Sequence, residues 1–180
     1  MHTIFFSGSR SISRLTLQVR ERIENIIHKN LDIVIGDANG ADKAIQRFLL
    51  ENNYEQVHVY CSGGRYRNNL GNWHIVQVDS NEMGREFYAE KDKKMAEIAD
   101  YGFILWDGKS IGSLNNIAEL LQKNKPSLVY YSPKKEFLKI KSDGDLRNIL
   151  SGMTDDVLTS ISDKGNDFLK TFTTKQIPLI

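Results

Sequence analysis

Cysteine is almost missing from this chain, which has Cys61 alone among its 180 residues. No internal disulfide can form, so a secreted disulfide scaffold is excluded, and we expect Cys61 to serve in packing. Long apolar runs are also missing, because no window approaches the roughly 20 apolar residues of a membrane span. The opening stretch MHTIFFSGSR has neither a basic leader nor a long apolar segment. These absences predict a cytoplasmic protein with no membrane segment.

An excess of charge of one sign is missing too. The 24 Lys and Arg residues almost balance the 23 Asp and Glu residues, which gives a net charge of +1. A chain-wide positive field is therefore excluded, and nucleic acid is not expected as a partner, although a local basic patch stays open. The 40% hydrophobic and 26% charged fractions are those of a globular protein of one domain.

Apolar runs alternate with segments of helical periodicity along the first 132 residues. This alternation predicts an α/β fold with a doubly wound, mostly parallel sheet of Rossmann type. The strand-like runs are residues 3–6, 32–36, 57–61, 74–78, 102–106 and 127–132, and the helical segments are residues 15–29, 41–49, 85–99 and 113–122.

Two regions do not follow this alternation. Residues 62–73, SGGRYRNNLGNW, are too long for a tight connection, and we interpret them either as a functional loop or as a solvated surface loop. Beyond residue 132 we predict an edge strand at 136–140 and short amphipathic helices over 143–172. The sequence thus predicts a Rossmann-like domain over 1–132 and a small C-terminal helical appendage over 133–180, packed on the core or on a second subunit.

Glycine-bearing strand exits indicate where a ligand would bind, since open parallel sheets bind ligands beyond the carboxyl ends of their strands. The first exit is SGSR, residues 7–10. Gly8 allows a close backbone approach, Ser9 can donate a hydrogen bond, and Arg10 can bind an anion through two N–H groups. A plain turn explains this exit equally well.

The second exit is GDANGAD, residues 36–42. Gly36 and Gly40 can form a concave set of backbone N–H groups. Asp37 could accept a hydrogen bond from a ribose hydroxyl, as carboxylates do in this fold. Both Asp37 and Asp42 oppose a phosphate at this exit, and Asp42 could instead cap its own helix.

The third exit is WDGKSIGSLNN, residues 106–116, which contains Asp107 and Gly108. We expect Gly112 and Ser113 to start a helix whose first N–H groups are free to bind an anion. Asn116 lies one turn further and faces the same mouth. The alternative is that Ser113 only caps the helix.

Lys91 interrupts an apolar stripe. Phe87, Lys91, Met95 and Ile98 share one helical face through spacings of four, four and three residues. The lysine either extends its amine outward to water or neutralises a ligand.

Four segments resemble the SLOG superfamily of Rossmann-like nucleotide-binding domains. They are FSGSR, IVIGDANGADKAI, AEKDKKMAEIADYGFILWDGKSIGSLNNIAEL and KPSLVYY, and they cover roughly residues 2–132 in the same order. The nearest branch is that of bacterial and phage proteins with a GSR start, a GGARGAD-like segment and a WDGKSxGT-like segment. The superfamily includes the Lonely-guy phosphoribohydrolases, DNA-processing protein A, and sensor domains that bind nucleotide-derived signals in antiviral systems.

The chain departs from the hydrolase signature PGGxGTxxE within this superfamily. Gly112 matches the glycine, but Ser113 replaces the threonine, Asn116 replaces the glutamate, and Lys91 stands where the preceding arginine would be. A neutral amide supplies no negative charge to an oxocarbenium-like transition state. The resemblance therefore implies binding better than bond cleavage.

The leading hypothesis is a domain that binds a nucleotide or nucleotide derivative at the carboxyl edge of the sheet, as a sensor in bacterial or phage stress or defence. It assigns no catalytic residue, cofactor or metal, and we expect a homodimer. One alternative is an N-glycosidase of nucleosides or nucleotides that uses Glu119, Asp37 or Glu90 in place of the missing glutamate. Another is a module for single-stranded DNA that uses Arg65, Tyr66 and Arg67 in the long loop.

Overall fold

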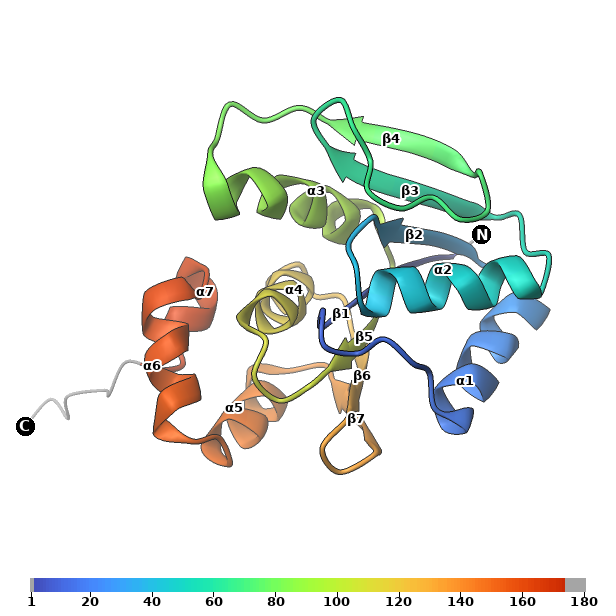
Figure 1. The fold of residues 1–180 in the computed structure, drawn as a ribbon. Coiled ribbons are helices and arrows are strands. Elements are labelled where there is room, and N and C mark those ends of the chain that lie inside the picture. The colour runs from blue at the N-terminus through green and yellow to red at the C-terminus, as the bar shows by residue number, and fades with distance from the viewer. Residues whose placement is uncertain (1, 174–180) are drawn as a thin grey trace, which may run out of the picture.

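The computed structural model describes residues 2–173 and is built around one seven-stranded sheet (Figure 1). The strand order is β4-β3-β2-β1-β5-β6-β7. All neighbouring strands are parallel except β6 and β7, which are antiparallel. The predicted α/β class and mostly parallel sheet are therefore confirmed. The strands are β1 (Thr3–Gly8), β2 (Asp32–Gly36), β3 (Val57–Ser62), β4 (His74–Val78), β5 (Tyr101–Trp106), β6 (Ser127–Tyr131) and β7 (Glu136–Ile140).

Helices cover both faces of the sheet because its central strands are apolar on both sides. In β1, Ile4 and Phe6 belong to the core beneath α1 and α2, whereas Phe5 belongs to the core beneath α3 and α4. This alternation follows from the two-residue period of a strand. The helices are α1 (Leu17–His28), α2 (Ala41–Glu51), α3 (Gly84–Ile98), α4 (Ile111–Gln122), α5 (Asp143–Ser151), α6 (Asp155–Lys164) and α7 (Asp167–Lys170).

The C-terminal helices form an outer layer on α4 (Figure 1). Their buried residues join the same core cluster as Leu114 and Ile117 of α4. β7 lies beyond residue 132 and completes the sheet, as the edge strand predicted there. The division of the chain at residue 132 stays a prediction. The buried residues of this layer are Leu146, Leu150, Val157, Ile161 and Leu169.

Helix α4 begins two residues before the predicted start. Its N-cap is Ser110, whose hydroxyl accepts a hydrogen bond from the Ser113 N–H at 3.5 Å. Serine is a favoured N-cap because its oxygen satisfies one of the free N–H groups of the first turn. The alternative that Ser113 caps the helix is therefore wrong, and Ser113 lies inside the first turn.

Residues 63–73 form no helix or strand, yet they are held by specific contacts. The indole N–H of Trp73 donates to the Tyr54 carbonyl at 2.9 Å, and the buried Asn68 side chain donates to the Asp37 carbonyl at 2.8 Å. The loop is therefore fixed against the β2 exit. Within residues 2–173 no helix is long and apolar enough to cross a bilayer.

Candidate functional site

A cleft of about 520 Å³ lies at the carboxyl edge of the sheet. β1 stands between β2 and β5, and the chain leaves β2 toward α2 on one face and β5 toward α4 on the other. A crevice forms at such a position, which is called a topological switch point, because the two connections run to opposite faces of the sheet. Residues from the exits of β1, β2 and β5 line the cleft together with residues of α3 and α6.

The structure brings most of the residues predicted from sequence into this cleft. Eight of the twelve line it, and the other four, Ser9, Asp37, Gly40 and Gly108, lie in the same three exits without lining it. Ser9 supports the lining residues, because its hydroxyl is 3.2 Å from that of Ser113 and accepts from the Asp107 N–H. The eight are Gly8, Arg10, Gly36, Lys91, Asp107, Gly112, Ser113 and Asn116.

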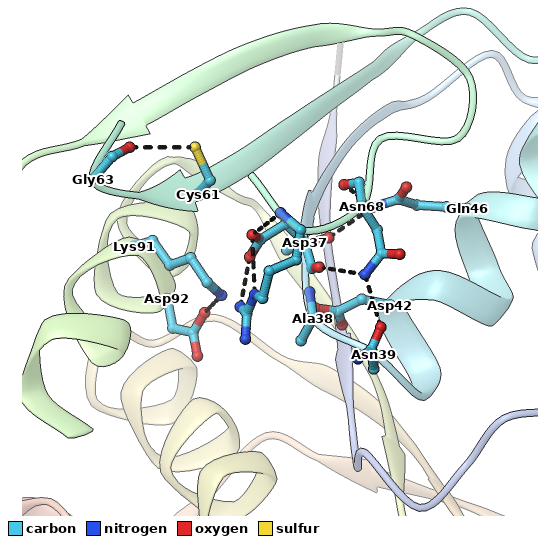
Figure 2. A network of polar contacts seen from close by, with 12 residues as sticks. Asp37, Ala38, Asn39, Asp42, Gln46, Cys61, Gly63, Asn68, Lys91 and Asp92 are labelled. Carbon is cyan, nitrogen blue, oxygen red and sulfur yellow. Dashed lines mark hydrogen bonds and ion pairs between the residues drawn. The ribbon is translucent and has the colours of Figure 1, made fainter. Parts of the chain in front are cut away.

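Lys91 is buried in the cleft wall and does not extend to water. Only 4% of the residue is exposed, and its Nζ lies 2.5 Å from Oδ1 of Asp92 (Figure 2). Burial alone would lower the pKa of Lys91, but the Asp92 and Asp42 carboxylates raise that pKa above its ordinary value. The amine therefore stays charged in the cleft wall, where it is paired with Asp92.

Asp42 lies beside this lysine as a second buried acidic group. Its Oδ2 accepts a hydrogen bond from the Ala38 N–H at 3.1 Å, while the N-cap of α2 is Gly40. Burial raises the pKa of Asp42 to about 7, although Lys91 opposes this shift. Near neutral pH the carboxyl is therefore partly protonated, which weakens its repulsion of a phosphate.

Gly36 is required by the close approach of these two side chains. A Cβ at this position would lie 2.5 Å from Oδ2 of Asp42 and 2.9 Å from Nζ of Lys91. Any side chain would displace both groups from the cleft wall. The glycine thus serves packing of charged groups as well as backbone approach.

Asp37 is held by Arg67 from the long loop. Arg67 Nη2 is 2.7 Å from Oδ1 of Asp37, and both Nε and the backbone N–H of Arg67 donate to Oδ2. Burial would raise the pKa of Asp37, but the hydrogen bonds and charge of Arg67 hold that pKa below its ordinary value. The carboxylate therefore anchors the loop, and its role toward a ribose stays a prediction.

The turn after β5 is organised by Asp107. Its carboxylate accepts hydrogen bonds from the Ser11 hydroxyl at 2.6 Å and from the N–H groups of Lys109 and Ser110. Burial would raise the pKa of Asp107, but these hydrogen bonds lower the pKa below its ordinary value. Gly108 adopts φ 80° in this turn, a conformation that favours glycine.

The first turn of α4 presents unsatisfied donors to the cleft. Among residues 2–173, the N–H groups of Ile111 and Gly112 have no acceptor. Asn116 lies one turn further and donates to the Ser7 hydroxyl at 2.7 Å and to Asp92 at 3.3 Å. Asn116 is thus engaged with the wall and fixes Asp92 beside Lys91.

Positive charge gathers in this cleft although the chain is almost neutral. Six lining side chains are cationic and three are acidic. Arg67 and Lys91 form ion pairs with Asp37 and Asp92, whereas the other four cations form none among the described residues. The cations are Arg10, Arg67, Arg85, Lys91, Lys109 and Lys164, and the acids are Asp42, Asp92 and Asp107.

Several lining residues escaped sequence reasoning. Asp92 had one signal, its position next to Lys91, while Ser7 had none beyond the SGSR exit. Arg85 and Lys164 lie 79 positions apart and meet only through tertiary packing. No motif could have placed them at one site.

The acids considered for an N-glycosidase lie outside the cleft. Glu119 pairs with Lys123 at 3.0 Å, and Glu90 pairs with Lys93 at 2.7 Å. Asp92 is the acid that contacts Lys91 and Asn116 in the cleft. Within residues 2–173 no group of three or more His, Cys, Asp or Glu side chains could hold a metal ion.

Comparison with known proteins supports the fold. No protein-family model and no curated protein matches the sequence. The chain is similar to DNA processing protein A from Helicobacter pylori, whose structure describes a single-stranded DNA binding mode. The TM-score is 0.56 with 18% sequence identity, over 90% of this chain and 79% of that chain. The likeness shows a shared Rossmann-like fold.

This comparison corrects one expectation. The near-neutral charge predicted that nucleic acid is not a partner, and that prediction is wrong, because the similar structure belongs to a protein that binds single-stranded DNA. The net charge of +1 is a sum over the whole chain. It therefore does not report the local gathering of cations around this cleft.

Proposed function

We propose that the cleft binds the phosphate of a nucleotide or nucleotide-derived ligand over the first turn of α4. The observation that carries this proposal is the convergence of the free Gly112 N–H and the buried Lys91 amine on one cleft. A helix N-terminus stabilises an anion through its N–H groups and dipole, and a buried cation adds to this effect. Arg10 and Lys109 line the same mouth.

We further propose that the chain is a member of the SLOG superfamily, in the branch with GSR, GGARGAD-like and WDGKSxGT-like segments. Support comes from the positions of these segments, since all three meet at the cleft. A binding role fits better than bond cleavage, because Asn116 stands at the glutamate position of the hydrolase signature. Its neutral amide donates hydrogen bonds to Ser7 and Asp92. The proposed biological role is that of a nucleotide sensor in bacterial or phage stress or defence.

A charge placed at Gly112 tests the phosphate position. Gly112 is exposed, and the nearest atom to a Cβ there is the Ser110 hydroxyl oxygen at 3.9 Å. Gly112→Asp therefore fits sterically. A carboxylate in the first turn interacts favourably with the helix dipole, but it repels a phosphate. We expect this variant to lose the thermal stabilisation that AMP gives the unaltered protein.

Gly112→Asn is the matched neutral control. It has nearly the same shape as aspartate without the charge, so it should retain more of the AMP-dependent stabilisation than Gly112→Asp. Equal stabilisation of the unaltered protein and Gly112→Asp would contradict phosphate binding at this turn.

Single-stranded DNA is the second candidate ligand, and the likeness to DNA processing protein A is the observation that favours it. In this chain exposed Arg10, Arg85 and Lys109 line the cleft. The half-exposed Tyr88 ring offers a stacking surface, with Arg67 5.1 Å from its centroid.

Salt dependence separates this candidate from a small nucleotide. A labelled oligothymidylate should bind with an affinity that falls steeply with salt, because several phosphates release counterions together. Fluorescence anisotropy at several salt concentrations measures this slope. No binding at low salt, with AMP binding intact, would exclude the second candidate.

A further inference from the structure

The cleft continues into a second cavity between α3 and the C-terminal helices. This cavity has a volume of about 310 Å³ and shares part of its lining with the cleft. The shared residues form a junction through which one ligand could occupy both spaces. They are Arg85, Ala89, Asp92, Asn115, Asn116 and Lys164.

Two cations without an ion pair among the described residues stand at this junction. Arg85 comes from the first turn of α3, and Lys164 is the last residue of α6. Both are exposed, and Ser160, one turn before Lys164, adds a hydroxyl to the cleft lining. Asp92 also lines the junction, but it is paired with Lys91. The inner part of the second cavity is lined by both signs of charge, from Glu86, Glu119, Asp167, Lys93 and Lys170. An anionic group is therefore favoured at the junction, beside the two cations.

The position of Lys164 relative to α4 is fixed by Asn115. The Asn115 side chain donates to the Lys164 carbonyl at 3.2 Å and accepts from the Asn166 N–H at 2.8 Å. Ile161 and Leu169 are fully buried in the same core as α4. The C-terminal layer is therefore attached to the helix whose first turn faces the cleft.

We propose that the C-terminal helices supply a second anionic subsite, so that the ligand is a nucleotide with at least two phosphoryl groups, of the nucleoside diphosphate class. This inference rests on the proposed function. One phosphate lies over the first turn of α4, and the next lies at the junction between Arg85 and Lys164. The C-terminal layer is then part of the binding site and selects for ligand charge.

The test compares AMP with ADP by isothermal titration calorimetry. The unaltered protein should bind ADP at least ~10-fold more tightly than AMP. The second phosphoryl group of ADP would accept hydrogen bonds from Arg85 and Lys164, and hydrogen bonds between charged groups are stronger than those between neutral groups. The double variant Arg85→Gln, Lys164→Gln should bind both nucleotides within ~3-fold of each other, mainly because it loses affinity for ADP. Lys29→Gln, at the C-cap of α1 near the opposite edge of the sheet, is the control and should keep the ADP preference.

The possible outcomes separate this inference from the proposed function. Equal affinities of the unaltered protein for AMP and ADP overturn the second subsite and leave phosphate binding standing. An ADP preference that survives in the double variant overturns the role of the C-terminal helices. Absence of binding by either nucleotide overturns both proposals. An oligothymidylate that needs Arg85 and Lys164 while ADP shows no preference overturns the diphosphate class in favour of single-stranded DNA.

Discussion

The guanidinium of Arg67 donates two hydrogen bonds to the carboxylate of Asp37, which lies 30 residues earlier in the sequence. Nη2 of Arg67 lies 2.7 Å from Oδ1, and Nε lies 3.1 Å from Oδ2. This geometry matches the planar fork of a guanidinium to a carboxylate, which a lysine amine cannot reproduce. The pair connects the exit of β2 to the long loop before β4 and so places the loop beside the cleft.

Replacing Arg67 should therefore loosen this loop. We expect Arg67→Lys to lower the free energy of unfolding by roughly 1 to 2 kcal/mol, because the buried Asp37 loses two directed donors. Urea denaturation measures the change. Arg65→Lys, at an exposed position in the same loop, should change the free energy by less than about 0.5 kcal/mol. Equal effects of the two substitutions would contradict the anchoring role.

Gly36→Ala should disrupt the charged wall of the cleft. Its Cβ would lie 2.5 Å from Asp42 Oδ2 and 2.9 Å from Lys91 Nζ, so two buried charged groups must move. We expect a loss of roughly 1 to 3 kcal/mol in stability and a loss of AMP binding. Gly64→Ala, where no atom lies within 4 Å of the Cβ, is the control that should keep both. Thermal melts with and without AMP report the two effects together.

The fold was predictable from the sequence because apolar runs and helical stripes alternate with short connections. Residues 74–78 and 136–140 were both predicted as strands, and both pair at the sheet edges. The three glycine-bearing exits were predictable as one region, since parallel strands bring their carboxyl ends to one edge. The start of α4 was not, because both Ser110 and Ser113 are good caps and only tertiary contacts decide between them.

The chemistry within the cleft was less predictable. The sequence left open whether Lys91 reaches water, and burial against Asp92 answers this only in three dimensions. The pairing of Asp37 with Arg67 was not predictable, because Arg67 comes from an irregular loop with no periodicity. Lys164 belongs to a helix that matched no motif, so its place in the cleft depends on how α6 packs on α4.

Asp42 predicts a stability that depends on pH. Its pKa is about 7 in the folded protein against 3.8 for the ordinary group, so the folded state binds the proton more tightly. This preference favours folding at low pH and is lost as the pH rises from about 4 through about 7. Asp42→Asn should therefore stabilise the protein at pH 8, by up to a few kcal/mol, and much less at pH 5. Urea denaturation at the two pH values measures the difference, and an equal effect at both would refute the assignment.

The same group should make anion binding depend on pH. Ionised Asp42 opposes a phosphate near Lys91, so AMP should bind the unaltered protein more tightly at pH 6 than at pH 8. The Asp42→Asn variant carries no such titration and should show a flatter profile. Calorimetry across this pH range measures the two profiles. The second ionisation of AMP affects both proteins equally, so the difference between their profiles is the contribution of Asp42. Parallel profiles for the two proteins would show that Asp42 does not act on the anion.

Asn115 connects the C-terminal helices to α4, whose first turn is the proposed phosphate site. Removing its side chain should loosen this connection without unfolding the core. Asn115→Ala removes the donor to the Lys164 carbonyl and the acceptor for the Asn166 N–H. We expect faster hydrogen exchange over residues 164–169, because these backbone groups lose their partners while Ile161 and Leu169 keep their apolar contacts. Asn148→Ala, at an exposed position of α5, should leave this exchange unchanged. Because Lys164 would then be held less firmly, Asn115→Ala should also reduce the preference for ADP over AMP, and a variant that exchanges faster yet keeps the full preference would show that Lys164 does not contact the second phosphate.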